Sequence, residues 1–262
     1  MKAEATRRST IAVIALLVTA GFIFLFAQKT PAQDTELLVV ATNGIKPSVE
    51  ELAPQIEHSI GRRLKMQFSS SPALAEKIQS GQPFDVAILS SDVIDDLIKQ
   101  GKIAAGTRTD IARTGIGVGV RAGAPKPDVS TPEALKRTLL SAKSISFNPS
   151  VASAAHIREI FEHLGIAENV KSKLMLDAEA GRPEMNVADG TAELVITVIP
   201  EIKFAKGVEL AGPVPADLQS YISFSAGAAT NTHDADAAKA LIKFIAGPAA
   251  TPTLKAKGME PR

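Results

Sequence analysis

Three short apolar segments alternate with three amphipathic segments along residues 37–99. The apolar segments are typical of buried β-strands, and the amphipathic ones have the spacing of helices. The predicted strands cover residues 37–42, 64–68 and 84–89, and the predicted helices cover residues 47–63, 72–80 and 92–99. Because the strands are apolar on both faces, this order predicts an α/β protein whose mostly parallel sheet is covered by helices.

A second unit of the same kind follows a stretch that glycine and proline interrupt. Residues 115–120 (GIGVGV) predict a glycine-interleaved strand, and the prolines at 125, 127 and 132 then break the regular pattern. We place a crossing between two domains there. The elements expected after it are the helix 132–141, the strand 144–147, the helix 154–164, an undefined segment at 177–182, the strand 194–199, a Gly/Pro-marked stretch at 207–215 and closing helical segments at 235–245 and 251–257.

The N-terminus has the layout of a secretory signal peptide. Lys2, Arg7 and Arg8 precede an apolar run over residues 11–27, and small residues near Ala32 permit cleavage before residue 33. The run is about as long as the shortest membrane-spanning helix, so a retained anchor is the alternative. We predict a signal peptide at residues 1–33 and a periplasmic protein.

Composition excludes several classes of function. Positive and negative side chains nearly cancel, to a formal net charge of +1, and the chain has no Trp and a single Tyr. Nucleic-acid grooves combine basic patches with stacking aromatic residues, so no nucleic-acid partner is expected. The absence of cysteine excludes disulfides, thiol catalysis and a cysteine-linked lipid anchor. We expect a monomer without a cofactor.

A serine run precedes the second predicted helix. Ser69, Ser70 and Ser71 stand just before Pro72, which suits the first position of a helix. Their hydroxyl groups and the free backbone N–H groups can converge on one negatively charged group. The alternative is that one serine simply caps the helix.

Three loops are expected at the edge of the sheet where ligands bind. In open α/β sheets that edge lies beyond the carboxyl ends of the strands. The loops are residues 42–44 (TNG), residues 69–71 (SSS) and residues 148–153 (NPSVAS). They come from both halves of the chain, so we predict a ligand site in a cleft between two lobes.

The chain resembles the periplasmic molybdate-binding proteins of ABC transporters, which are two-lobed, type II solute-binding proteins. The similar segments are SSSPALAEKIQSGQPFDVAILSSDVIDDLIKQGKI (69–103), HIREIFEHLGI (156–166) and AAKALIKFIAGPAATPTLKAKGMEP (237–261). The resemblance implies that two lobes close on a tetrahedral oxyanion and deliver it to an inner-membrane ABC permease, without catalysis. We expect residues 34–116 and 222–262 in the first lobe and residues 117–221 in the second, each with a mixed, mostly parallel sheet flanked by helices.

The resemblance also implies a set of ligand-binding residues. They are Ser71 or its neighbour Ser70 in the serine loop, Asn43 and Gly44 in the first loop, Ser153 and Ala154 in the second-lobe loop, Gly181, and Val198. The family has a serine near Gly44 and a tyrosine near Val198, so two side-chain donors are replaced here. The Asn43 amide, Asn148, Ser150 or Arg182 can compensate, or the ligand is a different anion such as a small carboxylate.

Rival chemistries have less support. His156, Glu159 and His163 share one face of a predicted helix and could ligate zinc in a periplasmic hydrolase, but the same spacing is typical of a solvated polar face. The chain has no Gly-x-Ser-x-Gly elbow. The glycines of residues 115–120 lack the spacing and the following helix of a dinucleotide loop, so a close-packed or hinge strand is favoured. We therefore predict no metal site and no catalytic residue.

Overall fold

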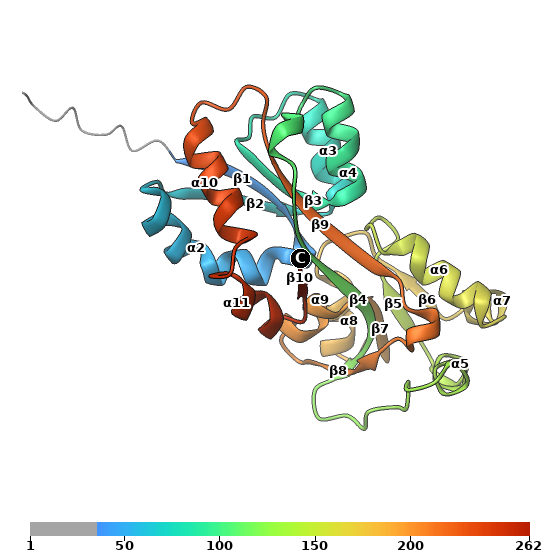
Figure 1. Cartoon of the computed structure of the whole chain (residues 1–262). Helices are drawn as coiled ribbons and strands as arrows, with labels where there is room; N and C mark the ends of the chain where they lie inside the picture. The colour runs from blue at the N-terminus through green and yellow to red at the C-terminus, as the bar shows by residue number, and fades with distance from the viewer. Residues whose placement is uncertain (1–35) are drawn as a thin grey trace, which may run out of the picture. The chain divides into compact units, whose positions relative to one another are not determined.

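A ten-stranded mixed sheet organises residues 36–262, the part of the chain that the computed structural model describes (Figure 1). The predicted signal peptide falls on residues 1–33 and lies outside the described residues. Among the described residues, no helix is long and apolar enough to cross a membrane. The main path of the sheet has the order β2-β1-β3-β9-β4-β7-β5-β6, and β8 and β10 both pair with β4.

The first part of the chain, together with its C-terminal segment, builds one end of this sheet. Strands β1 (Leu37–Thr42), β2 (Leu64–Ser69) and β3 (Val86–Ser90) pair in parallel, and β9 (Tyr221–Ala228) joins β3 in the antiparallel direction. The helical segments at this end are η1 (Asn43–Ile45), α2 (Lys46–Ile60), α3 (Ser71–Gln79), α4 (Ser91–Lys99), η2 (Ala105–Thr107), α10 (Ala235–Ile245) and α11 (Thr251–Ala256). These parallel strands confirm the alternation predicted over residues 37–99.

Alternate residues of these strands point into two separate cores. Val39 and Ile88 pack with apolar residues of α2, α10 and α11, whereas Val40 and Leu89 pack with those of α3 and α4. Successive side chains of a strand point to opposite faces, so α2, α10 and α11 cover one face and α3 and α4 cover the other (Figure 1). Because both faces of β1 and β3 are buried, their sequences are apolar runs without polar alternation.

The second half builds the other end of the sheet. Strands β5 (Ile145–Phe147), β6 (Leu174–Leu176) and β7 (Leu194–Val198) pair in parallel, and β8 (Val208–Pro213) pairs with β4 in the antiparallel direction. The helical segments here are α5 (Pro132–Ser141), α6 (Ala154–His163), α7 (Ala167–Lys171), α8 (Arg182–Ala188), α9 (Ile199–Phe204) and η3 (Ala216–Leu218).

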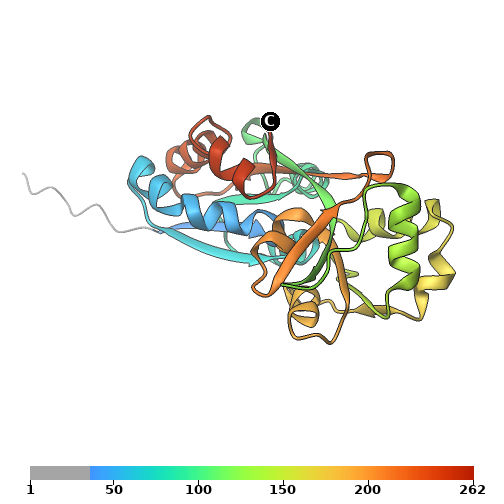
Figure 2. The same ribbon diagram turned by 90° about the horizontal axis from the view of Figure 1, so that it is seen from below.

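Strand β4 (Thr109–Arg121) connects the two ends. It pairs with β9 from Thr109 to Gly115 and with β7 from Ile116 to Val120, and the short β10 (Glu260–Pro261) pairs with its first part. The long strands β4 and β9 lie side by side in both views (Figures 1 and 2). The division into lobes at residues 117 and 221 stays a prediction, because the described residues form one compact unit.

Several elements differ from the sequence-based expectation. The strand predicted over residues 194–199 ends at Val198, because Ile199 and Pro200 begin α9 and proline is well tolerated in the first turn of a helix. The undefined segment at 177–182 leads into α8, and the Gly/Pro-marked stretch at 207–215 contains β8. Proline is tolerated at the end of β8 because, among the described strands, β8 pairs only with β4 and so lies at an edge.

Candidate functional site

A small cavity lies where the loops after several strands meet. It has a volume of about 20 Å³, which is room for about one water molecule. Its lining comes from the end of β1 and η1, the start of α3, the loop before α6, the β7–α9 junction and β9. The lining residues are Thr42, Asn43, Gly44, Ser70, Val151, Ala152, Ser153, Val198, Glu201, Ile222 and Phe224. The predicted convergence of three loops is therefore present, and a ligand larger than water requires these loops to separate.

Two serines supply hydroxyl groups to this small cavity. Ser70 caps α3, and its Oγ accepts a hydrogen bond from the backbone N–H of Ala73 at 3.3 Å. A hydroxyl group that accepts one hydrogen bond still has its own proton to donate. Ser153 precedes α6, is only 3% exposed and makes no capping hydrogen bond with its side chain. Both hydroxyl groups are thus available to an anion.

The opposite side of the small cavity is apolar. A Cβ atom on Gly44 would lie 2.9 Å from Cζ of Phe224 and 3.6 Å from Cγ2 of Val198. The Phe224 ring therefore occupies the space that a side chain at position 44 would need. Gly44 and Val198, the two positions where the resemblance implies that side-chain donors are replaced, lie next to each other beside this ring, and Ile222 also lines the cavity.

Three of the predicted residues lie outside the lining of the small cavity. Ser71 is 1% exposed, and its Oγ accepts the backbone N–H of Ser90 at 3.0 Å. The backbone N–H of Ala154 donates to the carbonyl of Val151 at 3.0 Å. Gly181 lines a neighbouring cavity and precedes α8 with a φ of 77°, which favours glycine. The structure thus brings together Asn43, Gly44, Ser70, Ser153 and Val198, but not the other three.

A large cavity of about 580 Å³ adjoins the small one and shares Asn43 and Glu201 with it. Its remaining lining residues are Lys46, Pro47, Glu50, Phe68, Ala180, Gly181, Glu184, Met185, Phe204, Ala205 and Lys206. Two of these, Met185 and Phe204, are exposed apolar side chains. Volumes of this size accommodate small organic ligands.

Two glutamates of the large cavity were not predicted from the sequence. Glu184 lies in the first turn of α8 and Glu201 in the first turn of α9, each directly after a proline. Glu184 is 5% exposed, and its Oε2 atom has no hydrogen-bond partner among the described residues. The signal that could have found them is the repeated Pro-Glu pair at the start of two helices beside the site. We call Glu184 and Glu201 the carboxyl pair.

Burial and mutual repulsion change the acidity of the carboxyl pair. Burial raises the pKa of Glu184. Burial, and then the negative charge of Glu184, raise the pKa of Glu201 to about 7, although Oγ1 of Thr197 donates a hydrogen bond to Oε2 of Glu201 at 2.6 Å, which acts in the opposite direction. The two carboxyl groups therefore do not both ionise freely near neutral pH.

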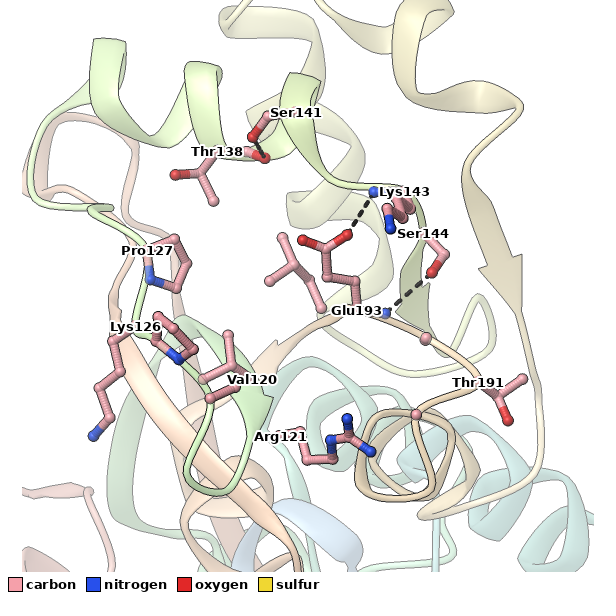
Figure 3. A pocket seen from close by; sticks show the side chains of 15 residues that line it. Val120, Arg121, Lys126, Pro127, Thr138, Ser141, Lys143, Ser144, Thr191 and Glu193 are labelled. Atoms are coloured by element: carbon pink, nitrogen blue, oxygen red, sulfur yellow. Dashed lines mark hydrogen bonds between the residues drawn. The ribbon is translucent and has the colours of Figure 1, made fainter.

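A third and larger cavity, of about 700 Å³, is a weaker candidate (Figure 3). It lies beside the end of β4 and the segments that lead into β5 and β7, away from the carboxyl ends of those two strands. Glu193 is already bonded there, because its Oε2 accepts the backbone N–H of Lys143 at 2.8 Å and its own N–H donates to Oγ of Ser144 at 3.0 Å (Figure 3). None of the predicted binding residues lines this cavity.

Comparisons with known proteins agree with this fold. Residues 37–260 match the family described as bacterial extracellular solute-binding protein. An aconitate isomerase of Pseudomonas sp. is 28% identical over 97% of each chain, and the molybdate-binding protein ModA of Azotobacter vinelandii is 30% identical over 87% of this chain and 90% of the relative. The solved periplasmic molybdate-binding protein of Azotobacter vinelandii superposes with a TM-score of 0.74 at 22% identity, covering 86% of this chain and 98% of the other. The chain belongs to the bacterial extracellular solute-binding proteins, among relatives of the molybdate-binding type.

Proposed function

We propose that this protein is the periplasmic binding component of an ABC transporter, and that it holds a small anion where its loops converge and delivers it to an inner-membrane permease. Membership of the family supports the binding role. The meeting of loops from both halves of the chain at one cavity supports the location of the site. Such a role requires binding and release, and no chemical step.

The lining favours an organic carboxylate over a bare oxyanion. The observation that carries this proposal is the Phe224 ring, which fills the space beside Gly44 and faces Val198. A tetrahedral oxyanion has no carbon atoms to pack against such a surface, and each charge-assisted hydrogen bond that it loses costs roughly 1.5–3 kcal/mol. A small carboxylate can place its oxygens on Ser70 and Ser153 and its carbon atoms on the apolar side.

The large cavity adds two cations to this arrangement. Lys46 and Lys206 both line it, so they are placed to attract further carboxylate groups of a ligand. Nζ of Lys46 is 3.8 Å from Oε1 of Glu50 and lies over the Phe68 ring. Glu50 and Phe68 line the same cavity. The relative named aconitate isomerase also supports a polycarboxylate ligand, because aconitate carries three carboxyl groups.

A tetrahedral oxyanion is the second candidate. The 30% identity to a protein named molybdate-binding supports it, and the two serine hydroxyl groups of the small cavity suit it equally. The two candidates differ at the apolar side of the small cavity: a carboxylate has carbon atoms that can pack against it, and a tetrahedral oxyanion has none.

Thermal-shift screening separates the two candidates. We expect small carboxylates, aconitate included, to raise the melting temperature more than molybdate, tungstate, sulfate or phosphate, because a ligand that binds only the folded state stabilises it by mass action. Ser153→Ala should reduce the shift by weakening affinity at least about tenfold. Ser172→Ala, at an exposed position after α7, is the matched control.

A shift with molybdate and tungstate alone would favour the second candidate. A shift that Ser153→Ala leaves unchanged would remove the small cavity from the proposal.

A further inference from the structure

The carboxyl pair lies beside the site proposed for the bound anion. Glu201 lines both the small and the large cavity, and Glu184 lines the large one. An anion in this site would lie beside two carboxylates if both were ionised, and like charges at short range repel. The unpaired Oε2 atom of the buried Glu184 makes that arrangement still more costly.

Among the described residues, no cation neutralises the pair. Lys46, Glu50 and Lys206 are the other charged residues of the large cavity, and none of them contributes to the pKa shift of either glutamate. Strands β4 and β8 pack on α8 and α9, and their charged residues have other partners or lie in another cavity. Asp110 of β4 pairs with Arg108, and Arg113 of β4 pairs with Glu260. Glu209 of β8 pairs with Lys126, and Arg121 of β4 lines the third cavity. The pair is therefore expected to retain one proton near neutral pH.

A pair of carboxyl groups that shares one proton holds a base and an acid side by side. This is the arrangement that a proton shift within one bound molecule requires, because one group must remove a proton and another must supply one. We propose that Glu184 and Glu201 catalyse the shift of a double bond in an unsaturated carboxylate bound in the large cavity. This inference rests on the proposed function, in which the site binds an organic carboxylate.

The step balances without any further reactant. The ionised carboxylate takes a proton from the methylene carbon next to the double bond, and the electrons of that C–H bond form a new double bond to the central carbon. The electrons of the old double bond take the proton of the other carboxyl group at the former vinylic carbon. The pair still carries one proton afterwards, with the two roles exchanged.

The cavity suits a substrate of this class. Its volume of about 580 Å³ lies within the usual range for small organic ligands. Lys46 and Lys206 are available to the carboxylate groups of the substrate, and Phe68, Met185 and Phe204 offer apolar surface to its carbon atoms. The relative named aconitate isomerase is independently consistent with an unsaturated tricarboxylate as the substrate.

The test is hydrogen exchange with aconitate in D₂O, followed by NMR. The wild-type protein should introduce deuterium at the carbon atoms that gain a proton and should interconvert the isomers of aconitate. Glu201→Gln should lower this rate at least about 100-fold, the lower end of what a positioned acid or base contributes. Glu162→Gln, on the exposed face of α6, is the control that should retain the rate.

Glu184→Gln supplies a readout that a purely structural role would not change. Glu184→Gln removes one member of the pair, so exchange should be slower. Removal of the neighbouring charge also lowers the pKa of Glu201, so the pH at which the remaining exchange is half-maximal should move to lower values. Thermal shift with aconitate, measured on each variant, shows whether the variant is folded and still binds.

The outcomes separate this inference from the proposed function. If aconitate stabilises the wild-type protein but no deuterium enters it, the proton-transfer inference is overturned and the binding function stands. If Glu201→Gln retains the rate, or aconitate does not bind although another carboxylate does, the inference is also overturned. If no carboxylate stabilises the protein, the proposed function itself fails.

Discussion

Single residues decide the chemistry of this site, and Glu201 gives the most direct prediction at this scale. Its pKa is raised to about 7 in the folded protein, above the ordinary value of 4.5, so the folded state holds a proton that the unfolded state loses between these two values. Stability from this group is therefore fully present below about pH 4.5 and is lost as the pH rises through about 7.

Replacing Glu201 by Gln should remove this dependence. We expect Glu201→Gln to be more stable than the wild type at pH 8, by an amount of the order of 2 kcal/mol, since solvent screens part of the cost at a partly exposed group. The two proteins should be nearly equal in stability at pH 4, below the ordinary pKa of the group. Urea unfolding at both pH values measures this, with Glu162→Gln as the control, and an equal difference at the two pH values would contradict the assignment.

Gly44 gives a second prediction at the residue scale. Gly44→Ser introduces the hydroxyl group that the resemblance implies near this position, but its Cβ would lie 2.9 Å from the Phe224 ring. We expect a loss of about 1–3 kcal/mol in unfolding free energy from this overpacking. The loss should be smaller in a Phe224→Ala background, and a double-mutant cycle in urea measures the coupling. Additive effects would show that the ring does not occupy this space.

Some of the site was predictable residue by residue, and some was not. The loop positions of Asn43, Gly44, Ser70 and Ser153 followed from their place after strands, and Val198 followed only from the resemblance; the structure brings all five together. Ser70 and Ser71 could not be distinguished from the sequence, because the cap of α3 decides which hydroxyl faces the cavity. The carboxyl pair was missed because its burial depends on how α8 and α9 pack, and no local pattern shows that.

At the scale of elements, strand β4 is shaped by its glycines. A Cβ atom on Gly119 would lie 2.7 Å from Val195, 2.9 Å from Ile202 and 3.0 Å from Val208, so β7, α9 and β8 can all approach this strand closely. The glycine-interleaved pattern of residues 115–120 thus predicted a close-packed strand correctly. It gave no sign of the strand's full length of 13 residues, because the preceding segment is polar and partly exposed.

Gly119→Ala tests this packing. We expect a loss of about 1–3 kcal/mol in unfolding free energy, because valine and isoleucine side chains that pack on the strand cannot give way without strain. Gly106→Ala is the matched control, since no atom lies within 4 Å of a Cβ built there. Chemical unfolding of both variants measures the difference, and equal stabilities would contradict the close approach.

Prediction of the elements succeeded where a strong local pattern coincided with burial. The bounds of α5 and α10 match the expected helices residue for residue. Short elements such as β6 and α7 were missed, because three to five residues are too few for a period to show. The end of β7 was placed one residue too late, since Ile199 is apolar but begins a helix.

At the scale of the whole molecule, the family and the type of fold could be predicted, because the order of strands and helices and the serine-loop block carry both. The chemistry of the ligand could not, because it depends on side chains such as Phe224 that come from distant segments. The location and bounds of the two lobes remain predictions, as does delivery to a permease.

Crystallisation with the anion that stabilises the protein most tests the central proposal directly. The account predicts a carboxylate whose oxygens contact the hydroxyl groups of Ser70 and Ser153, with its carbon atoms against Phe224 and Val198. An anion held in the cavity beside Arg121 and Lys143, or a ligand that contacts neither serine, would contradict it.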